Sequence, residues 1–131
     1  MLDVSMILSS EYVNGGRDYP QWDCWGLVRH VFNEIHGVAL PSLGGLNAES
    51  LYGKTKARKR VIDHLAWSEA QHGAIAEAVT GDACAHVGIV IDYNGSLMVL
   101  ETTPDTGPRM LTLEEFKDEY ETVVYHTHAQ A

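Results

Sequence analysis

Residues 23–37 read Asp23-Cys24-Trp25-Gly26-Leu27-Val28-Arg29-His30-Val31-Phe32-Asn33-Glu34-Ile35-His36-Gly37. Apolar residues fall at positions 24, 27, 28, 31, 32 and 35, which is the spacing of one face of an α-helix. Asp23 stands where a helix N-cap is expected, and Gly37 stands where a glycine commonly ends a helix. The segment therefore predicts a helix that begins at Cys24 and buries its apolar face.

Beyond residue 72 the pattern becomes that of strands. We expect strands over residues 74–79, 87–93, 97–102 and 122–127, with turns at Gly81-Asp82 and Asn94-Gly95. Thr112 and Glu115 have the spacing of a capping box, so we expect a short helix over residues 111–120. Helices followed by strands indicate the α+β class, with the helix of Cys24 packed on an antiparallel sheet.

The first 72 residues otherwise predict helices and loops. Residues 14–20 contain asparagine, glycine and proline and predict a loop. We expect a long loop with one or two short helices over residues 41–61, and a helix over residues 57–66. The chain has no internal repeat and no low-complexity linker. Its 131 residues fit one domain, which we expect to span residues 1–131.

The charge balance excludes some classes of partner. The chain has 18 acidic and 9 basic residues, a formal net charge of −9, which argues against binding of a nucleic-acid backbone. The main basic cluster, at residues 54–60, lacks interleaved aromatic side chains and is interpreted as a solvated surface. No apolar run has the length of a membrane span, and the first residues lack the basic region of a signal peptide. We therefore expect no nucleic-acid or membrane partner and a protein that is cytoplasmic when made.

Cys24 is the first candidate for chemistry. It falls in the first turn of the predicted helix, where unpaired N–H groups and the helix dipole stabilise a thiolate and can bind an oxyanion. A cysteine at a helix start also suits a small buried apolar side chain. A base within reach of the sulfur decides between these interpretations.

His86 is the best placed of the seven histidines to be that base. It opens the apolar strand His-Val-Gly-Ile-Val-Ile-Asp-Tyr, and Gly88 leaves space on the same face for a substrate or for the helix of Cys24. Two histidines lie on the helix of Cys24 but a turn or more away, two lie in polar surroundings, and two lie near the C-terminus, where exposed histidines are common: His30, His36, His64, His72, His126 and His128.

Glu101 lies on the return strand of the predicted hairpin, beside His86. A carboxylate there would orient the imidazole and raise the imidazole pKa through its charge. The alternative, an exposed residue at a strand end, stays open. Cys84 and His86 would share one face of their strand, but no further ligand pair has the spacing of a zinc site, so we expect neither a metal nor another cofactor. The chain also has no Cys-x-x-Cys motif.

Three segments resemble one known family. Asp23-Cys24-Trp25-Gly26-Leu27-Val28 resembles the Asp-Cys-x-Gly-Leu-Val signature of the NlpC-type cell-wall peptidases, which are papain-like cysteine hydrolases. Tyr12-Val13-Asn14-Gly15-Gly16 is similar to the Tyr-x-x-Gly-Gly segment of that family, and His86-Val87-Gly88-Ile89 to its His-Val-Gly-Ile strand. The matches occur in the order found in the family and extend from Tyr12 to Glu101.

The resemblance implies a papain-like fold and hydrolysis of amide bonds in peptidoglycan stem peptides. It implies that Cys24 is the nucleophile and that His86 is the base. It further implies that a substrate-binding surface includes Tyr12, Asp23 and Trp25. Glu101 stands where the family often has histidine, asparagine or glutamine, and Trp25 replaces a small residue.

The segment Cys-Trp-Gly-Leu-Val-Arg at residues 24–29 looks most like phage tail-associated members of the family. This implies a phage- or prophage-encoded peptidase with phage tail proteins as partners. Two other functions stay open: a tail assembly module with little catalysis, and a Cys–His amidase or acyltransferase that acts on another small amide. Faster alkylation of Cys24 than of Cys84 would favour catalysis.

Overall fold

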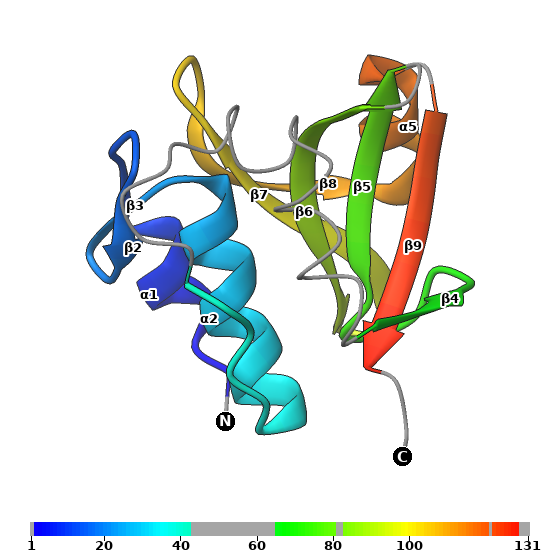
Figure 1. Cartoon of the computed structure of the whole chain (residues 1–131), viewed down its shortest axis with the longest axis horizontal. Helices are drawn as coiled ribbons and strands as arrows, with labels where there is room; N and C mark the ends of the chain where they lie inside the picture. The colour runs from blue at the N-terminus through cyan, green and yellow to red at the C-terminus, as the bar shows by residue number, and fades with distance from the viewer. Residues whose placement is uncertain (1, 43–64, 81–82, 121, 129–131) are drawn as a thin grey trace.

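The computed structural model describes residues 2–42, 65–80, 83–120 and 122–128. Within this part, the N-terminal elements are α1 (Val4–Leu8), β1 (Glu11–Tyr12), β2 (Arg17–Asp18), β3 (Gln21–Trp22) and α2 (Cys24–His36). The C-terminal elements are β4 (Leu65–Ser68), β5 (Ile75–Thr80), β6 (Ala83–Tyr93), β7 (Ser96–Thr103), β8 (Gly107–Thr112), α5 (Leu113–Glu119) and β9 (Thr122–His128) (Figure 1).

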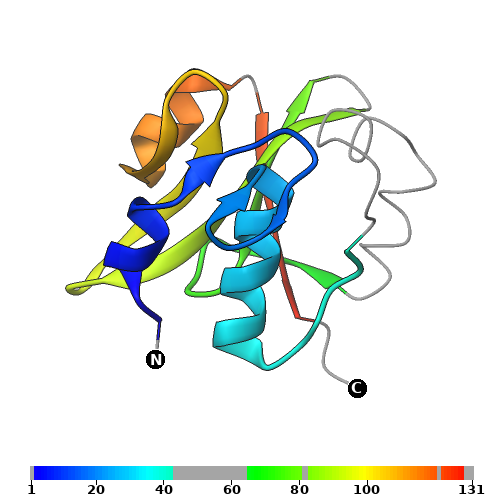
Figure 2. The same cartoon turned by 90° about the vertical axis from the view of Figure 1, so that its left-hand side faces the viewer.

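The C-terminal strands form one six-stranded antiparallel sheet in the order β4-β9-β5-β6-β7-β8. A small sheet, β1-β3-β2, precedes α2, and β1 pairs with β3 in parallel. Figures 1 and 2 show α2 lying against the large sheet, with the small sheet beside its first turn. The predicted α+β class, a cysteine-bearing helix on an antiparallel sheet, is confirmed.

Helix α2 begins and ends as its sequence predicts. The Asp23 side chain accepts a hydrogen bond from the N–H of Gly26, and Gly37 ends the helix with a φ of 69°. Its apolar face packs in a cluster with alternate residues of β6, and Val28 and Phe32 of this face are fully buried. Burial of this face supplies most of the stability of such a helix.

The opposite face of the sheet is covered by α5. Phe116 of α5 is fully buried among Val90 of β6 and Val99 of β7. The capping box predicted at Thr112 and Glu115 is present and begins the helix. None of the helices in the described ranges is long and apolar enough to cross a membrane.

Gly26 explains how the first turn of α2 is held. A Cβ atom at this position would lie 2.6 Å from the Cβ of Trp22 and 2.8 Å from the carbonyl oxygen of Gly16. Only glycine lets the small sheet approach the helix this closely. The approach fixes the position of Cys24, two residues earlier.

Several boundaries differ from the predictions. The helix expected over residues 57–66 is wrong at Leu65 and Ala66, which pair with β9 in β4; its remaining residues, and the turn Gly81-Asp82, lie outside the described residues. The helix expected over 111–120 starts at Leu113, because Leu111 and Thr112 pair with β7. The expected loop over residues 14–20 contains β2, which pairs with β3. The four expected strands are present, as β5, β6, β7 and β9.

Candidate active site

The thiol of Cys24 and the imidazole of His86 are joined by a hydrogen bond. Cys24 is the first residue of α2 and is 6% exposed, whereas His86 lies in β6 with an 11% exposed side chain. The two meet because α2 packs on β6 and β7. The site therefore combines a sulfur at the positive end of a helix with an imidazole on a buried strand.

Glu101 of β7 holds the other side of the imidazole. Its Oε1 atom lies 2.9 Å from Nε2 of His86, which leaves Nδ1 of the ring for the thiol. The Glu101 side chain has no exposed surface. The structure therefore rejects the alternative of an exposed strand-end residue.

The surroundings of His86 favour its protonated form. Burial by itself lowers the imidazole pKa, but the hydrogen bonds and charges of Cys24 and Glu101 outweigh it and raise the pKa to about 9. The ring therefore carries a proton at neutral pH and can deliver it to a reacting group.

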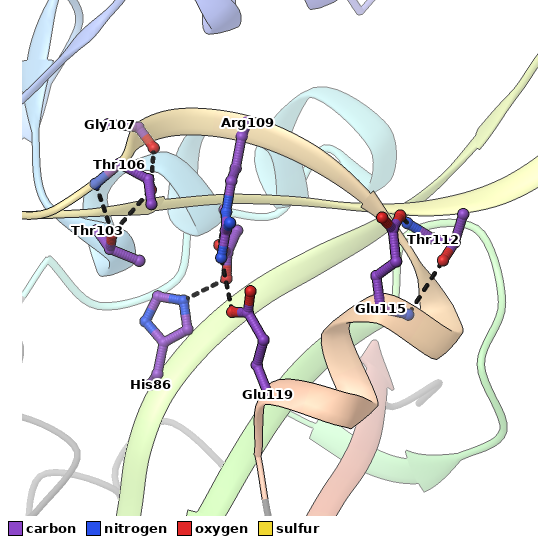
Figure 3. Close-up of polar contacts among 9 residues, drawn as sticks. His86, Thr103, Thr106, Gly107, Arg109, Thr112, Glu115 and Glu119 are labelled. Atoms are coloured by element: carbon purple, nitrogen blue, oxygen red, sulfur yellow. Dashed lines mark hydrogen bonds and ion pairs between the residues drawn. The ribbon is translucent and has the colours of Figure 1, made fainter.

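Arg109 of β8 connects Glu101 to α5. Its Nε atom lies 2.5 Å from Oε2 of Glu101, and Nη2 lies 2.6 Å from Oε2 of Glu119. Figure 3 shows the Arg109 side chain descending between His86 and Glu119. Burial raises the Glu101 pKa, but His86 and Arg109 outweigh this effect and hold it below the ordinary value of 4.5. Glu101 is therefore an ionised, buried carboxylate with a cationic partner on each oxygen.

Two aromatic rings of α5 cover the imidazole. The Tyr120 ring, just beyond the end of the helix, stacks on His86 with ring centres 5.5 Å apart and planes at 30°, and Phe116 lies at 6.1 Å. Burial raises the pKa of Tyr120 above its usual value, so the phenol keeps its proton at neutral pH. The rings limit the orientations that His86 can adopt.

A cavity of about 400 Å³ opens beside His86. Hydroxyl groups and charged side chains contribute to its wall, which is lined by His86, Thr103, Asp105, Thr106, Arg109, Glu119 and Tyr120. Another cavity, of about 190 Å³, lies along α2 and includes neither Cys24 nor His86 in its lining. The first of the two is in contact with the imidazole, although Cys24 is not among its lining residues.

The three residues expected at a substrate-binding surface lie around the start of α2. Tyr12 is half-buried in β1 opposite Trp22 of β3. Asp23 has no exposed surface and accepts hydrogen bonds from Gly26 and from Nη1 of Arg17. Trp25 also has no exposed surface, and its indole N–H donates to the carbonyl of Pro41. Asp23 and Trp25 therefore support the helix start from inside the protein.

Two predictions around His86 and the C-terminus need correction. Gly88 does not leave space for a substrate or for α2, because a Cβ atom there would lie 2.6 Å from Val99 and 3.4 Å from Phe116. His126 is not exposed: it is 2% exposed, and its Nδ1 atom lies 2.7 Å from Oε1 of the buried Glu77. Pairing of β9 with β5 brings these two residues together.

Sequence reasoning missed Arg109 and Tyr120. Neither belongs to a motif, and both reach the site through β8 and α5, which pack beside β7. The available signal was the capping box at Thr112, which fixes where α5 starts and hence which residues face β7.

The chain was also compared with known proteins. The model of the NlpC/P60 family matches residues 9–125, which includes α2, the six-stranded sheet up to β9, and Cys24, His86 and Glu101. A comparison with curated protein sequences gives no match.

Proposed function

Because the chain belongs to the NlpC/P60 family, whose members are cysteine-peptidase-type hydrolases that act on peptidoglycan, we propose that Cys24 and His86 carry out hydrolysis of amide bonds in peptidoglycan stem peptides. The observation that carries the proposal is the hydrogen bond between the two side chains, with the thiol at a helix N-terminus. This is the arrangement that an activated thiol nucleophile requires.

The first half of the reaction transfers the acyl group to sulfur. The Cys24 thiolate attacks the amide carbonyl and forms a carbon–sulfur bond, while the negative charge passes to the carbonyl oxygen. The backbone N–H of Cys24, at the helix start where no intrahelical acceptor is available, can donate to that oxygen. The carbon–nitrogen bond then breaks as the His86 imidazolium gives its proton to the leaving amine, which leaves a thioester and a neutral imidazole.

The second half restores the enzyme. His86 accepts a proton from a water molecule as the water oxygen attacks the thioester. The carbon–sulfur bond breaks, the carboxylic acid leaves, and the proton on His86 again balances the thiolate. Glu101 keeps the imidazole oriented and compensates its positive charge throughout, which is the role of the third residue in such sites.

The cavity beside His86 is proposed to receive the amine side of the scissile bond. Since His86 delivers the proton to the leaving nitrogen, that part of the substrate lies on the imidazole side of the sulfur. The cavity opens there, and the protonated phenol of Tyr120 offers a hydrogen bond to a polar peptide.

Incubation with purified peptidoglycan, followed by mass analysis of the released fragments, tests the function. We expect soluble stem-peptide fragments whose masses correspond to addition of one water across an amide bond. Fragments that arise only from cleavage of the glycan strands, or no released fragments, would exclude amide hydrolysis of this substrate. As a control, the protein is first treated with a thiol-alkylating reagent. The alkylated protein is expected to leave the peptidoglycan uncleaved.

We further propose that the peptidase is encoded by a phage or prophage and works with tail proteins. The support is the sequence of residues 24–29, which resembles tail-associated members of the family. The prediction is that the chain is detected by mass spectrometry in purified phage particles and in isolated tails. Particles that contain other tail proteins but not this chain would contradict it.

A further inference from the structure

We infer that Arg109 is a positioning residue for the Cys24–His86 pair: acting through Glu101, its guanidinium keeps the carboxylate charged and oriented and so determines the pH range in which the thiol is reactive. The inference rests on the proposed function in one respect only, namely that Cys24 is the reacting group. It concerns thiol reactivity, which can be measured without peptidoglycan.

The geometry divides the two oxygens of Glu101 between two cations. Oε1 faces His86 at 2.9 Å, and Oε2 faces Nε of Arg109 at 2.5 Å. The carboxylate has no exposed surface, so water does not replace either partner. An unpaired oxygen on a buried carboxylate is strongly unfavourable, and Arg109 prevents this at Oε2.

Arg109 is itself held at two points. It lies directly opposite Glu101 in the β7–β8 pair, and its Nη2 atom lies 2.6 Å from Glu119 of α5. The Arg109 side chain is 30% exposed, whereas that of Glu101 is fully buried. The guanidinium therefore bridges the buried carboxylate and the rim of the cavity, as Figure 3 shows for Arg109 and Glu119.

The charges around His86 determine the sign of the effect. The titratable and charged groups that face the imidazole are Cys24 of α2, Glu101 of β7, Arg109 of β8, and, around the adjoining cavity, Asp105, Glu119 and Tyr120. Within the part of the chain that the structure describes, Arg109 is the one permanent cation among these groups. Removal of its charge makes the site more negative, so protons bind more tightly and the pH at which the thiol becomes reactive rises.

The test is the rate constant for alkylation of Cys24 by iodoacetamide as a function of pH, in a Cys84→Ala background so that a single thiol reports. We expect Arg109→Met to move the midpoint of the alkylation profile upward by about one pH unit. Arg109→Lys, which keeps the charge, is expected to have a midpoint close to that of the parent. Glu119→Gln removes the outer contact but leaves the Glu101–Arg109 pair, so its midpoint is expected to stay close to that of the parent.

Three outcomes would overturn the inference: an Arg109→Met profile that coincides with the parent profile, an Arg109→Lys shift as large as that of Arg109→Met, or an equal shift in Glu119→Gln. The last two would mean that the position of α5, rather than the charge, controls the thiol. If Arg109→Met does not fold, Arg109→Gln, which also removes the charge, takes its place in the comparison. Failure to cleave peptidoglycan would refute the proposed function and leave the alkylation result intact.

Discussion

Replacing Cys24 with alanine is expected to reduce peptidoglycan hydrolysis by roughly four orders of magnitude or more, because no other group in the proposed mechanism forms the thioester. Cys24 is small and nearly buried, so the change removes one sulfur from the helix start and is expected to alter the free energy of unfolding by about 1 kcal/mol. The measurement is the initial rate of stem-peptide release by the purified variant, together with its urea unfolding curve.

Cys84→Ala provides the matched control. Cys84 lies in β6 two residues before His86, and we expect its removal to leave the rate of peptide release close to that of the parent. His86→Ala is expected to lose activity as Cys24→Ala does, because the pair acts as a unit. Retention of hydrolysis in a folded Cys24→Ala protein would show that Cys24 is not the nucleophile.

Glu101→Gln is expected to lower both activity and stability. The amide keeps the shape of the carboxylate but not its charge, and its NH2 group can only donate, so either His86 or Arg109 loses its acceptor. We expect the rate of peptide release to fall by a factor of roughly 10² to 10⁴, as when the orienting carboxylate of such a site is neutralised. The free energy of unfolding at neutral pH is expected to fall by about 2 kcal/mol.

The loss of stability in Glu101→Gln should depend on pH in a defined direction. The pKa of Glu101 in the folded protein is held below the ordinary value of 4.5, so its contribution is complete above that pH and is lost as the pH falls through the folded value. The difference in free energy of unfolding between parent and variant, measured in urea, should therefore be large near neutral pH and become smaller in acid. A gap that grows in acid would contradict the assigned contacts.

Glu119→Gln is the control for this second prediction. Glu119 contacts the same arginine, but its side chain is 43% exposed. Exposed ion pairs contribute little, so we expect a change of less than about 1 kcal/mol at any pH. Equal losses in the two variants would assign the effect to the anchoring of α5.

How far the fold could be predicted depends on the local signals. Helix α2 has a cap, an apolar face and a terminal glycine, and its limits were predicted to the residue. Strand β8 was not predicted, because Gly107-Pro108-Arg109 interrupts the alternation of apolar and polar residues that indicates a strand. The strand exists because it lies at the edge of the sheet, where proline is tolerated, and pairs with β7. Because β8 was not predicted, Arg109 was not recognised as a neighbour of Glu101.

The candidate site was likewise predictable only where its residues lie in segments with clear local signals. The chemistry of Cys24 and the rigid setting of His86 follow from their own segments, but their pairing came from the family resemblance. The burial of Trp25 and His126 depends on neighbours far along the chain: the carbonyl of Pro41 for the indole, and Glu77 for the imidazole. No local pattern reports such contacts.

The hydrogen bond between Cys24 and His86 joins a helix near one end of the chain to a strand formed much later in the sequence. During synthesis, Cys24 emerges well before its partner exists and has the reactivity of an ordinary thiol. In the proposed mechanism, the nascent chain needs no inhibitory segment to stay inactive, because the thiol gains its partner only when α2 docks on the completed sheet. The rate at which the thiol gains reactivity during refolding therefore measures the rate of that docking step.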